Sequence, residues 1–260
     1  MRILLVLLLI AAPAFAQEPD KEVLAKQVAN PISDLVSVPF QFNWDQGVGP
    51  DDQTRFVLNV QPVIPFHLSP RVNLIARVIV PFIGQPPLAP GGEPASGIGD
   101  ILTSFFVVPP TGGLMLGVGP VFNLPSTAEP TLGTEKWCVG PTVVALKQAG
   151  PWTVGALWNR YWSFDGNDAR PDVNQMFVQP FLAYGKHGTT ITLQSESTAN
   201  YEVDEDRWTV PVNLVVSKVS HFGSFPASYA LGGGTYVESP PGGPEWKLRA
   251  AITLLLPTKH

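Results

Sequence analysis

Residues 55–82 read RFVLNVQPVIPFHLSPRVNLIARVIVPF, which is two long apolar stretches separated by a short polar link. In both stretches apolar side chains recur at every second position, and polar side chains such as Arg55, Asn59 and Arg77 lie between them. Successive side chains of a β-strand point to opposite faces, so the pattern predicts two antiparallel strands with one apolar and one polar face each. The same alternation returns in residues 246–256.

The links between the predicted strands alternate between short and long. We count twelve strand-like stretches after residue 30. The short links include 67–71, 109–112, 148–151, 185–188 and 219–224, and the long links are 84–97, 125–135, 165–174 and 199–206. Strands of about ten residues in an up-and-down meander with this loop asymmetry are typical of a transmembrane β-barrel. We therefore predict an all-β fold, an antiparallel barrel of about 12 strands over residues 32–260.

The first residues have the features of a secretory signal peptide. Arg2 supplies a positive charge, residues 3–12 are apolar, and Ala14-Phe15-Ala16 fits a small-residue cleavage site. We expect residues 1–16 to be removed and residues 17–31 to form an N-terminal segment in the periplasm, the compartment that also receives the short turns.

One segment has helical rather than strand periodicity. In residues 20–29 (DKEVLAKQVA), Val23, Leu24 and Val28 recur at helical spacing, and Asn30-Pro31 ends the run. We expect a short periplasmic helix that leads into the barrel. The alternative is a plug that enters the lumen.

The composition indicates a chain that places apolar surface in lipid. It is 45% hydrophobic and only 14% charged, whereas soluble domains carry about 25% charged residues. After the signal peptide, no uninterrupted apolar run reaches the length of a transmembrane helix. The net charge of -5 gives no electrostatic reason to expect a nucleic-acid partner. We expect outer-membrane lipid and a small-molecule solute as partners, in the bacterial outer membrane.

Aromatic residues gather at the ends of the predicted strands. They are Phe42, Trp44, Phe66, Phe82, Trp137, Trp152, Trp162, Phe164, Trp208, Tyr236 and Trp246. Amphipathic rings are stable at a membrane–water interface, so the pattern predicts the two aromatic girdles of a barrel. Ordinary strand-end aromatics in a core are the alternative.

Prolines near the middle of strands oppose a regular sheet. They are Pro39, Pro62, Pro81, Pro120, Pro141, Pro180 and Pro211. Proline removes a ladder donor, so we expect local bulges. Four of these prolines end a Val-Gln-Pro or Val-Gly-Pro motif at equivalent strand positions, which suggests a degenerate hairpin repeat.

Two stretches carry a resemblance to a known family. They are residues 30–43 (NPISDLVSVPFQFN) and Gly97-Ile98-Gly99-Asp100-Ile101 followed by Phe105-Phe106. With the repeated Gln-Pro strands, they resemble the bacterial outer-membrane proteins named for the MetA pathway of phenol degradation. Members of that family are often labelled simply transporter, or mislabelled neuromedin U. The resemblance covers nearly all of the mature chain and implies an outer-membrane barrel that moves small, apolar or aromatic compounds.

The sequence offers no constellation for catalysis. Nucleophilic catalysis needs a serine with a base such as histidine in reach. Three of the four histidines, His67, His187 and His221, fall in short links, and no Gly-x-Ser-x-Gly motif occurs. No two histidines are spaced as metal ligands on one element, and the acidic residues within 202–206 fit a solvated loop better than a cation site. We expect no enzyme activity, no metal and no cofactor.

The polar faces of the strands predict the lining of the lumen. The candidate residues are Arg55, Asn59, Gln61, Asn73, Arg77, Asp100, Asn123, Gln175, Gln179, Gln194, Glu196, Asn213, Lys247 and Arg249. Phe177 and Phe181 share the parity of Gln175 and Gln179, so they point into the lumen unless the register flips at Pro180. Opposed basic and acidic side chains could pair and fill the interior.

Three functions fit these patterns. The leading hypothesis is a passive channel or porin-like transporter for small molecules, with apolar or aromatic compounds as the candidate solutes. The second is a non-conducting structural or surface-binding outer-membrane barrel, closed by pairs of Arg and Glu. The third is a soluble secreted β-sandwich that binds a ligand.

Overall fold

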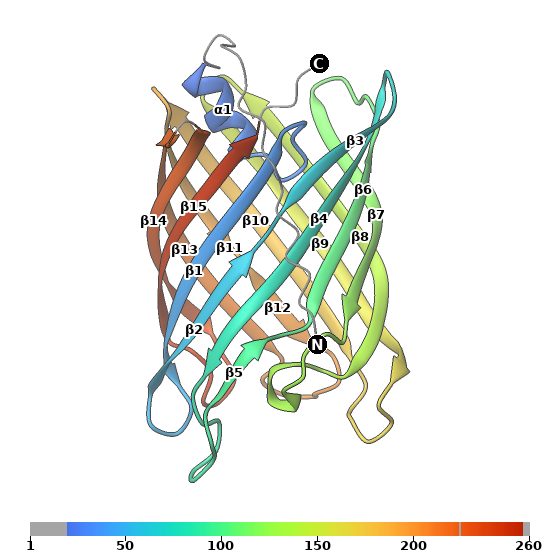
Figure 1. The fold of residues 1–260 in the computed structure, drawn as a ribbon, viewed down its shortest axis with the longest axis vertical. Coiled ribbons are helices and arrows are strands. Elements are labelled where there is room, and N and C mark those ends of the chain that lie inside the picture. Colours follow the sequence, from blue (N-terminus) through green and yellow to red (C-terminus); the bar gives the residue numbers. More distant parts are fainter. Residues whose placement is uncertain (1–19, 224, 257–260) are drawn as a thin grey trace, which may run out of the picture.

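The computed structural model describes residues 20–223 and 225–256. The predicted signal peptide and residues 17–19 lie outside the described residues. The chain forms a closed antiparallel barrel of 12 strands (Figure 1), which confirms the predicted fold class and excludes the β-sandwich. The segments β2 and β3, β5 and β6, and β11 and β12 are each one interrupted strand, and pairing of β1 with β15 closes the barrel.

The bounds of the helix and strands are α1 Lys21–Val28, β1 Val36–Val48, β2 Gln53–Val60, β3 Val63–Ser69, β4 Val72–Gln85, β5 Ala95–Ile98, β6 Ile101–Val108, β7 Leu114–Leu124, β8 Lys136–Ala149, β9 Trp152–Gly166, β10 Asn174–Lys186, β11 Thr189–Ser195, β12 Ser197–Asn200, β13 Trp208–Phe222, β14 Phe225–Glu238 and β15 Trp246–Leu256. A 3-10 turn, η1, covers Pro130–Leu132.

The outer surface of the barrel is apolar, and the inner surface is polar along strands such as β13 and β15. On β13, Leu214 is 54% exposed, whereas its neighbour Asn213 is 2% exposed. On β15, Leu248 is half-exposed, whereas Lys247 and Arg249 are buried. In a soluble sandwich the apolar face would be the buried one. Here it covers the outside of a closed barrel, as lipid contact requires.

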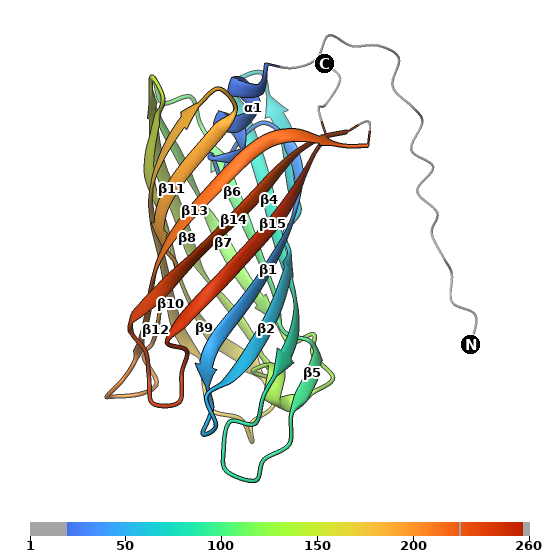
Figure 2. The ribbon, with the colours of Figure 1, turned by 90° about the vertical axis from the view of Figure 1, so that its left-hand side faces the viewer.

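The two ends of the barrel differ, and Figure 2 shows the inclined strands that join them. The links β3–β4, β8–β9 and β10–β11 are tight turns at the end that carries α1, which we call the short-turn end. The longer links, which include 125–135 and 201–207, lie at the opposite, long-loop end.

The predicted girdle of aromatic residues is largely confirmed. The exposed members are Phe66, Phe82, Trp137, Trp152, Trp162, Phe164 and Trp246. Tyr236 was wrongly included. Its side chain turns inward, because its hydroxyl donates a hydrogen bond of 2.9 Å to the buried carboxylate of Asp45.

The N-terminal helix forms where it was predicted, but it does not simply lead into the barrel. Asp20 caps α1 by accepting a hydrogen bond of 2.9 Å from the backbone of Glu22. Leu24 packs in a buried apolar cluster with Val219 and Leu255, at the inner rim of the short-turn end. The apolar face of the helix therefore docks on the barrel, and α1 covers part of its mouth.

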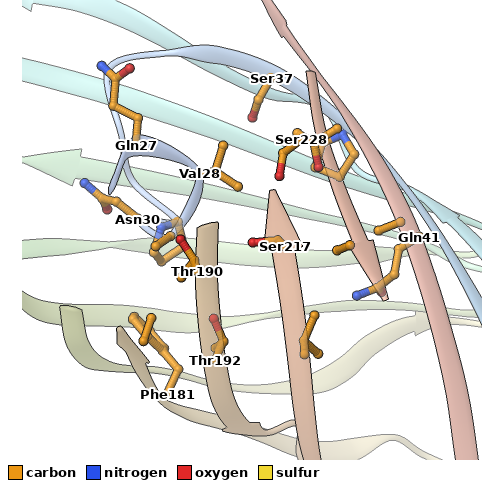
Figure 3. A pocket seen from close by; sticks show the side chains of 18 of the residues that line it. Gln27, Val28, Asn30, Ser37, Gln41, Phe181, Thr190, Thr192, Ser217 and Ser228 are labelled. Carbon is orange, nitrogen blue, oxygen red and sulfur yellow. The ribbon is translucent and has the colours of Figure 1, made fainter. Parts of the chain in front are cut away.

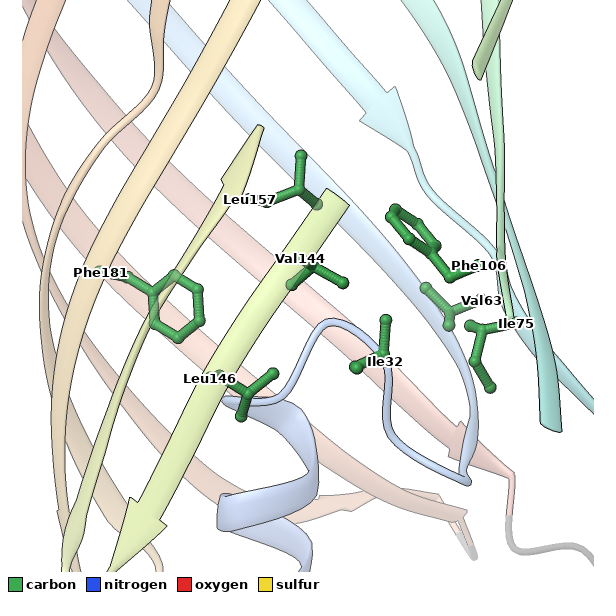
Figure 4. Packing of buried hydrophobic residues seen from close by; sticks show 8 residues of the cluster. All are labelled: Ile32, Val63, Ile75, Phe106, Val144, Leu146, Leu157 and Phe181. Atoms are coloured by element: carbon green, nitrogen blue, oxygen red, sulfur yellow. The ribbon is translucent and has the colours of Figure 1, made fainter. Parts of the chain in front are cut away.

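The residues after the helix continue into the lumen. Ile32 is buried among Val63, Ile75 and Phe106 on one wall, and the cluster extends to Leu157 and Phe181 on the opposite wall (Figure 4). Ile32 therefore fills part of the interior, whereas the helical segment to which the plug alternative referred stays at the mouth of the barrel.

The mid-strand prolines produce bulges at some positions only. A register shift falls between Val210 and Pro211, and the β2–β3 strand is interrupted at Gln61-Pro62. By contrast, Pro180 pairs with Ala156 without a shift, so the register of β10 does not flip.

In each Val-Gly-Pro motif, the glycine lies where the neighbouring strand comes unusually close. A Cβ at Gly119 would overlap the carbonyl oxygen of Phe105, and a Cβ at Gly140 would overlap that of Arg160. Only glycine allows the neighbouring strand to approach so closely at these points.

Candidate functional site: a divided lumen

Two cavities lie inside the barrel, one above the other. The helix-side cavity has a volume of about 240 Å³ and extends from α1 towards the middle of the barrel. The loop-side cavity, of about 280 Å³, continues towards the long-loop end. Five side chains line both cavities, and we call their level the junction: Gln41, Gln61, Arg77, Gln179 and Arg249.

One ion network lies on the loop side of the junction. The carboxylate of Asp45 is 2.9 Å from Arg55 Nη2 and 3.5 Å from Lys247 Nζ. It also accepts the hydroxyl of Tyr236. Asp45 thereby ties β1 to its neighbours β2 and β15 and, through Tyr236, to β14.

A second ion pair links two side chains inside the barrel, on the loop side of the junction. Arg249 donates two hydrogen bonds to the carboxylate of Glu196, which lies between β11 and β12. Its Nε donates a further bond of 2.8 Å to Asn43 Oδ1. In the β14–β15 register, Gly232 stands opposite Arg249 and Gly234 stands opposite Lys247.

Arg77 differs from the other cations of the interior. Its Nη2 donates one hydrogen bond of 2.9 Å, to Gln61 Oε1. Among the described residues, no carboxylate lies within ion-pair distance of its guanidinium, whereas Arg55, Lys247 and Arg249 each have one. An arginine carries five N–H donors, so most of those on Arg77 remain for a solute or water.

The helix-side cavity has two kinds of wall (Figure 3). Hydroxyl side chains from β1, β11, β13, β14 and β15 form one wall; they are Ser37, Thr190, Thr192, Ser217, Ser228 and Thr253. Val28 of the helix, Val63 and Phe181 supply apolar contact. The cavity therefore combines hydroxyl groups, apolar surface and the two guanidinium groups of the junction.

The helix leaves a way out of the interior. A third cavity of about 470 Å³ lies between α1 and the turns that join β8 to β9 and β10 to β11. It shares Ala25, Ala29, Ala183 and Thr190 with the helix-side cavity. Successive cavities share lining residues, from the long-loop end, through the junction, to the short-turn end beside α1.

Three contacts hold α1 and the residues that follow it beside this third cavity. Gln148 Nε2 donates to the carbonyl oxygen of Lys26 at 3.0 Å, and the backbone of His187 donates to Glu22 Oε1 at 3.0 Å. Asn30 Nδ2 lies 3.4 Å from Met115 Sδ. These contacts are few and polar, apart from the buried cluster around Leu24.

Many of the predicted lumen residues lie at the cavities. The loop-side cavity is lined by Arg55, Asn59, Gln61, Arg77, Gln179, Glu196, Lys247 and Arg249, and the helix-side cavity also by Gln194. Phe177 and Phe181 both point inward, as one reading of β10 predicted.

The other predicted residues lie elsewhere. Asp100 accepts hydrogen bonds from Thr134 and Asn123 and fixes the 125–135 loop. Asn213 is buried opposite Gln194 and Gly234. Gln175 accepts a hydrogen bond from Tyr161, and Asn73 pairs with Val108 near the short-turn end. None of these other predicted residues lines either main cavity.

Sequence reasoning missed the inner face of β1. Gln41, Asn43 and Asp45 line the loop-side cavity. They alternate with Phe40, Phe42 and Trp44, so the signal used for the other strands was present here too.

The described residues give no sign of a metal or helical membrane site. None of their His, Cys, Asp and Glu side chains gather in a group of three or more that could hold a metal ion. No helix in the described part of the chain is long and apolar enough to cross a membrane.

A closed barrel with an apolar outer surface and a polar, charged interior defines a β-barrel protein of the bacterial outer membrane. No family model and no curated protein sequence matches the chain. Among solved structures, it is similar to the COG4313 outer membrane channel from Pseudomonas putida F1, with 16% identity and a TM-score of 0.62 over 85% of this chain and 94% of that chain. It is also similar to the NanC porin, with 8% identity and a TM-score of 0.55 over 86% of this chain and 100% of that chain. At these identities the similarity shows the shared barrel fold.

Proposed function

We propose that this protein is a passive channel that carries small solutes across the outer membrane. The observation that carries the proposal is the series of three cavities that meet at the junction and at α1. The likeness to channel and porin barrels supports it. With 12 strands, the barrel is wider than the filled eight-stranded type and narrower than the open porins.

The charges of the interior favour anions. Four cationic side chains and two carboxylates line the loop-side cavity; they are Arg55, Arg77, Lys247 and Arg249, and Asp45 and Glu196. The two carboxylates offset only part of the positive charge, and the low-dielectric walls of the barrel focus the field of the excess, which is positive. We propose that the channel conducts chloride better than potassium.

A finer proposal follows from the resemblance to the MetA-pathway family of phenol degradation. In that reading the solutes are small apolar or aromatic compounds. The inward positions of Phe177 and Phe181 support it, because both rings line the cavities through which a solute would pass.

We also propose that the protein is not an enzyme. Serine and threonine hydroxyls line the helix-side cavity, but the described residues that line it include no histidine to act as a base.

Planar-bilayer recording of the refolded mature chain tests the proposed channel. We expect discrete current steps. In a gradient of KCl, the reversal potential should have the sign of the chloride equilibrium potential rather than that of potassium. Arg77→Gln should reduce chloride selectivity, because it removes a charge at the junction. The matched control is Lys218→Gln, a lysine of β13 that is exposed on the outside of the barrel.

One observation favours a second candidate, a non-conducting barrel. The helix covers part of the mouth, and the Arg249–Glu196 pair occupies space inside the barrel beside the junction. A barrel that inserts into the bilayer but passes no current would contradict the channel and support this alternative.

A further inference from the structure

The guanidinium of Arg77 is a half-buried cation that forms no ion pair among the described residues, and the charge of Glu196 acts on it only from beyond contact distance. Glu196, the carboxylate at the junction, is engaged by both terminal nitrogens of Arg249. Asp45 is engaged by Arg55 and Lys247. Gln61 gives Arg77 a neutral acceptor only. A buried charge is costly unless an opposite charge or several hydrogen bonds compensate it. An anion in the cavity would provide both.

The shape of a guanidinium selects among anions. Its planar fork of N–H donors matches the two oxygens of a carboxylate, which it binds through two parallel hydrogen bonds. Arg77 lines both cavities, so its free donors are accessible from the solute path.

The surroundings of Arg77 on the helix side are apolar as well as polar. Val63 stands directly opposite Arg77 in the β3–β4 register and lines the same cavity. Phe181 presents its ring to the cavity (Figure 3), and Val28 of α1 borders it too. A solute held at Arg77 would thus place the rest of its body against apolar side chains.

The size of the helix-side cavity limits that body. Its volume of about 240 Å³ is below the range of roughly 300–1,000 Å³ typical of pockets for drug-sized ligands. A single ring or a short chain is the scale that fits.

From these observations we infer that the helix-side cavity is a binding site for a small organic acid, with its carboxylate on Arg77 and its apolar or aromatic body beside Val63 and Phe181. The inference rests on the proposed channel, in which this site would bind selected solutes on their way through the barrel. A solute of this kind would use both the positive charge of the junction and the apolar wall of the cavity.

The test measures how three probes of one size affect the chloride current of the refolded mature chain. They are benzoate, the neutral benzyl alcohol and the cation benzylammonium. We expect benzoate to interrupt the current at concentrations at which the other two have little effect. Arg77→Gln should raise the benzoate concentration needed by about tenfold, as expected when a charged hydrogen-bonded pair is lost.

Two variants separate this site from general electrostatics. Arg55→Gln removes one positive charge from the loop-side cavity but leaves Asp45 paired with Lys247, and it should keep the response to benzoate. Phe181→Ala should weaken the effect of benzoate and leave that of acetate, which lacks the ring. Equal effects of benzoate and benzyl alcohol, or an unchanged response in Arg77→Gln, would overturn the inference.

Calorimetry keeps the inference testable if the barrel is silent. A silent barrel contradicts the channel, but binding of benzoate to the detergent-refolded protein can still be measured. Binding that Arg77→Gln abolishes and Arg55→Gln retains would support the site. Absence of binding to the unaltered protein would overturn it.

Discussion

Glu196 and Arg249 join segments of the wall that are not neighbours in the sheet. Two hydrogen bonds link the pair, and Arg249 is almost fully buried. The strands β13 and β14 lie between the two residues in the sheet order.

Replacing Glu196 by Gln should destabilise the barrel, because it leaves the charge of Arg249 unpaired in the interior. We expect a loss of about 2–4 kcal/mol in the free energy of unfolding, measured by urea titration of the refolded protein. The double replacement with Arg249→Gln should recover much of that loss. Equal stabilities for the unaltered protein and Glu196→Gln would show that the pair contributes nothing.

At the residue scale, prediction from sequence succeeded where a strand alternates cleanly. The sequence pattern predicts that Lys247, Arg249 and Arg77 face the lumen, because apolar residues alternate with them along the strand. Tyr236 was misplaced, since an aromatic residue at a strand end looks the same whether it faces lipid or, as here, a buried carboxylate. That Arg77 lacks a carboxylate partner could not be predicted, because pairing depends on side chains from distant strands.

At the element scale, β8 and β9 approach each other closely at Gly140. A Cβ there would overlap the carbonyl oxygen of Arg160 on the neighbouring strand. Gly140→Ala should force the strands apart and cost ~1–3 kcal/mol of unfolding free energy. The matched control is Gly84→Ala on β4, where the added methyl meets only Phe56 at 3.8 Å. Similar losses in both variants would contradict the role of close strand approach.

The helix α1 narrows the exit from the helix-side cavity. Deletion of residues 20–31 should raise the single-channel conductance severalfold, because it removes the cover of the mouth. The barrel should still fold, since α1 contributes no strand pairing. Val23→Ala, on the exposed face of the helix, should leave the conductance unchanged. An unchanged conductance after deletion would mean that the solute path does not pass α1.

The existence of this helix followed from its periodicity, but its position did not. Leu24 and Val28 need an apolar partner, and the sequence offers many. The partners are Val219 and Leu255, which reach the helix only when the barrel closes. Ile32 enters the lumen for the same reason, because the apolar inner wall that receives it is assembled from several strands.

At the scale of the whole molecule, the outer surface is matched to hydrocarbon. Leu214 lies near the middle of β13 and is exposed on the outside. Leu214→Arg should destabilise the barrel in lipid by ~2–4 kcal/mol, the cost of a cation near the bilayer midplane. Glu205→Arg, in an exposed loop, should be close to neutral. Urea titration in vesicles gives both values, and a neutral Leu214→Arg would argue against a lipid-facing position.

The fold as a whole was predictable because loop lengths, strand length and alternation all indicate the same meander. The interior was less predictable. The division into cavities arises from side chains of β1, β4, β10 and β15 that meet across the lumen, and no local pattern specifies that meeting.

The central claim is that a water-filled path passes the junction, and labelling at Gln179 tests it most directly. Gln179 lines both cavities. Gln179→Cys, combined with Cys138→Ala, would be recorded in a planar bilayer while a sulfonated methanethiosulfonate reagent is added to one side. Leu214→Cys, on the lipid-facing surface, is the control. We predict that the reagent reduces the current of the Gln179 variant and leaves the control unaffected. A current through the Gln179 variant that persists at full size, with the thiol unmodified, would contradict a solute path through the junction.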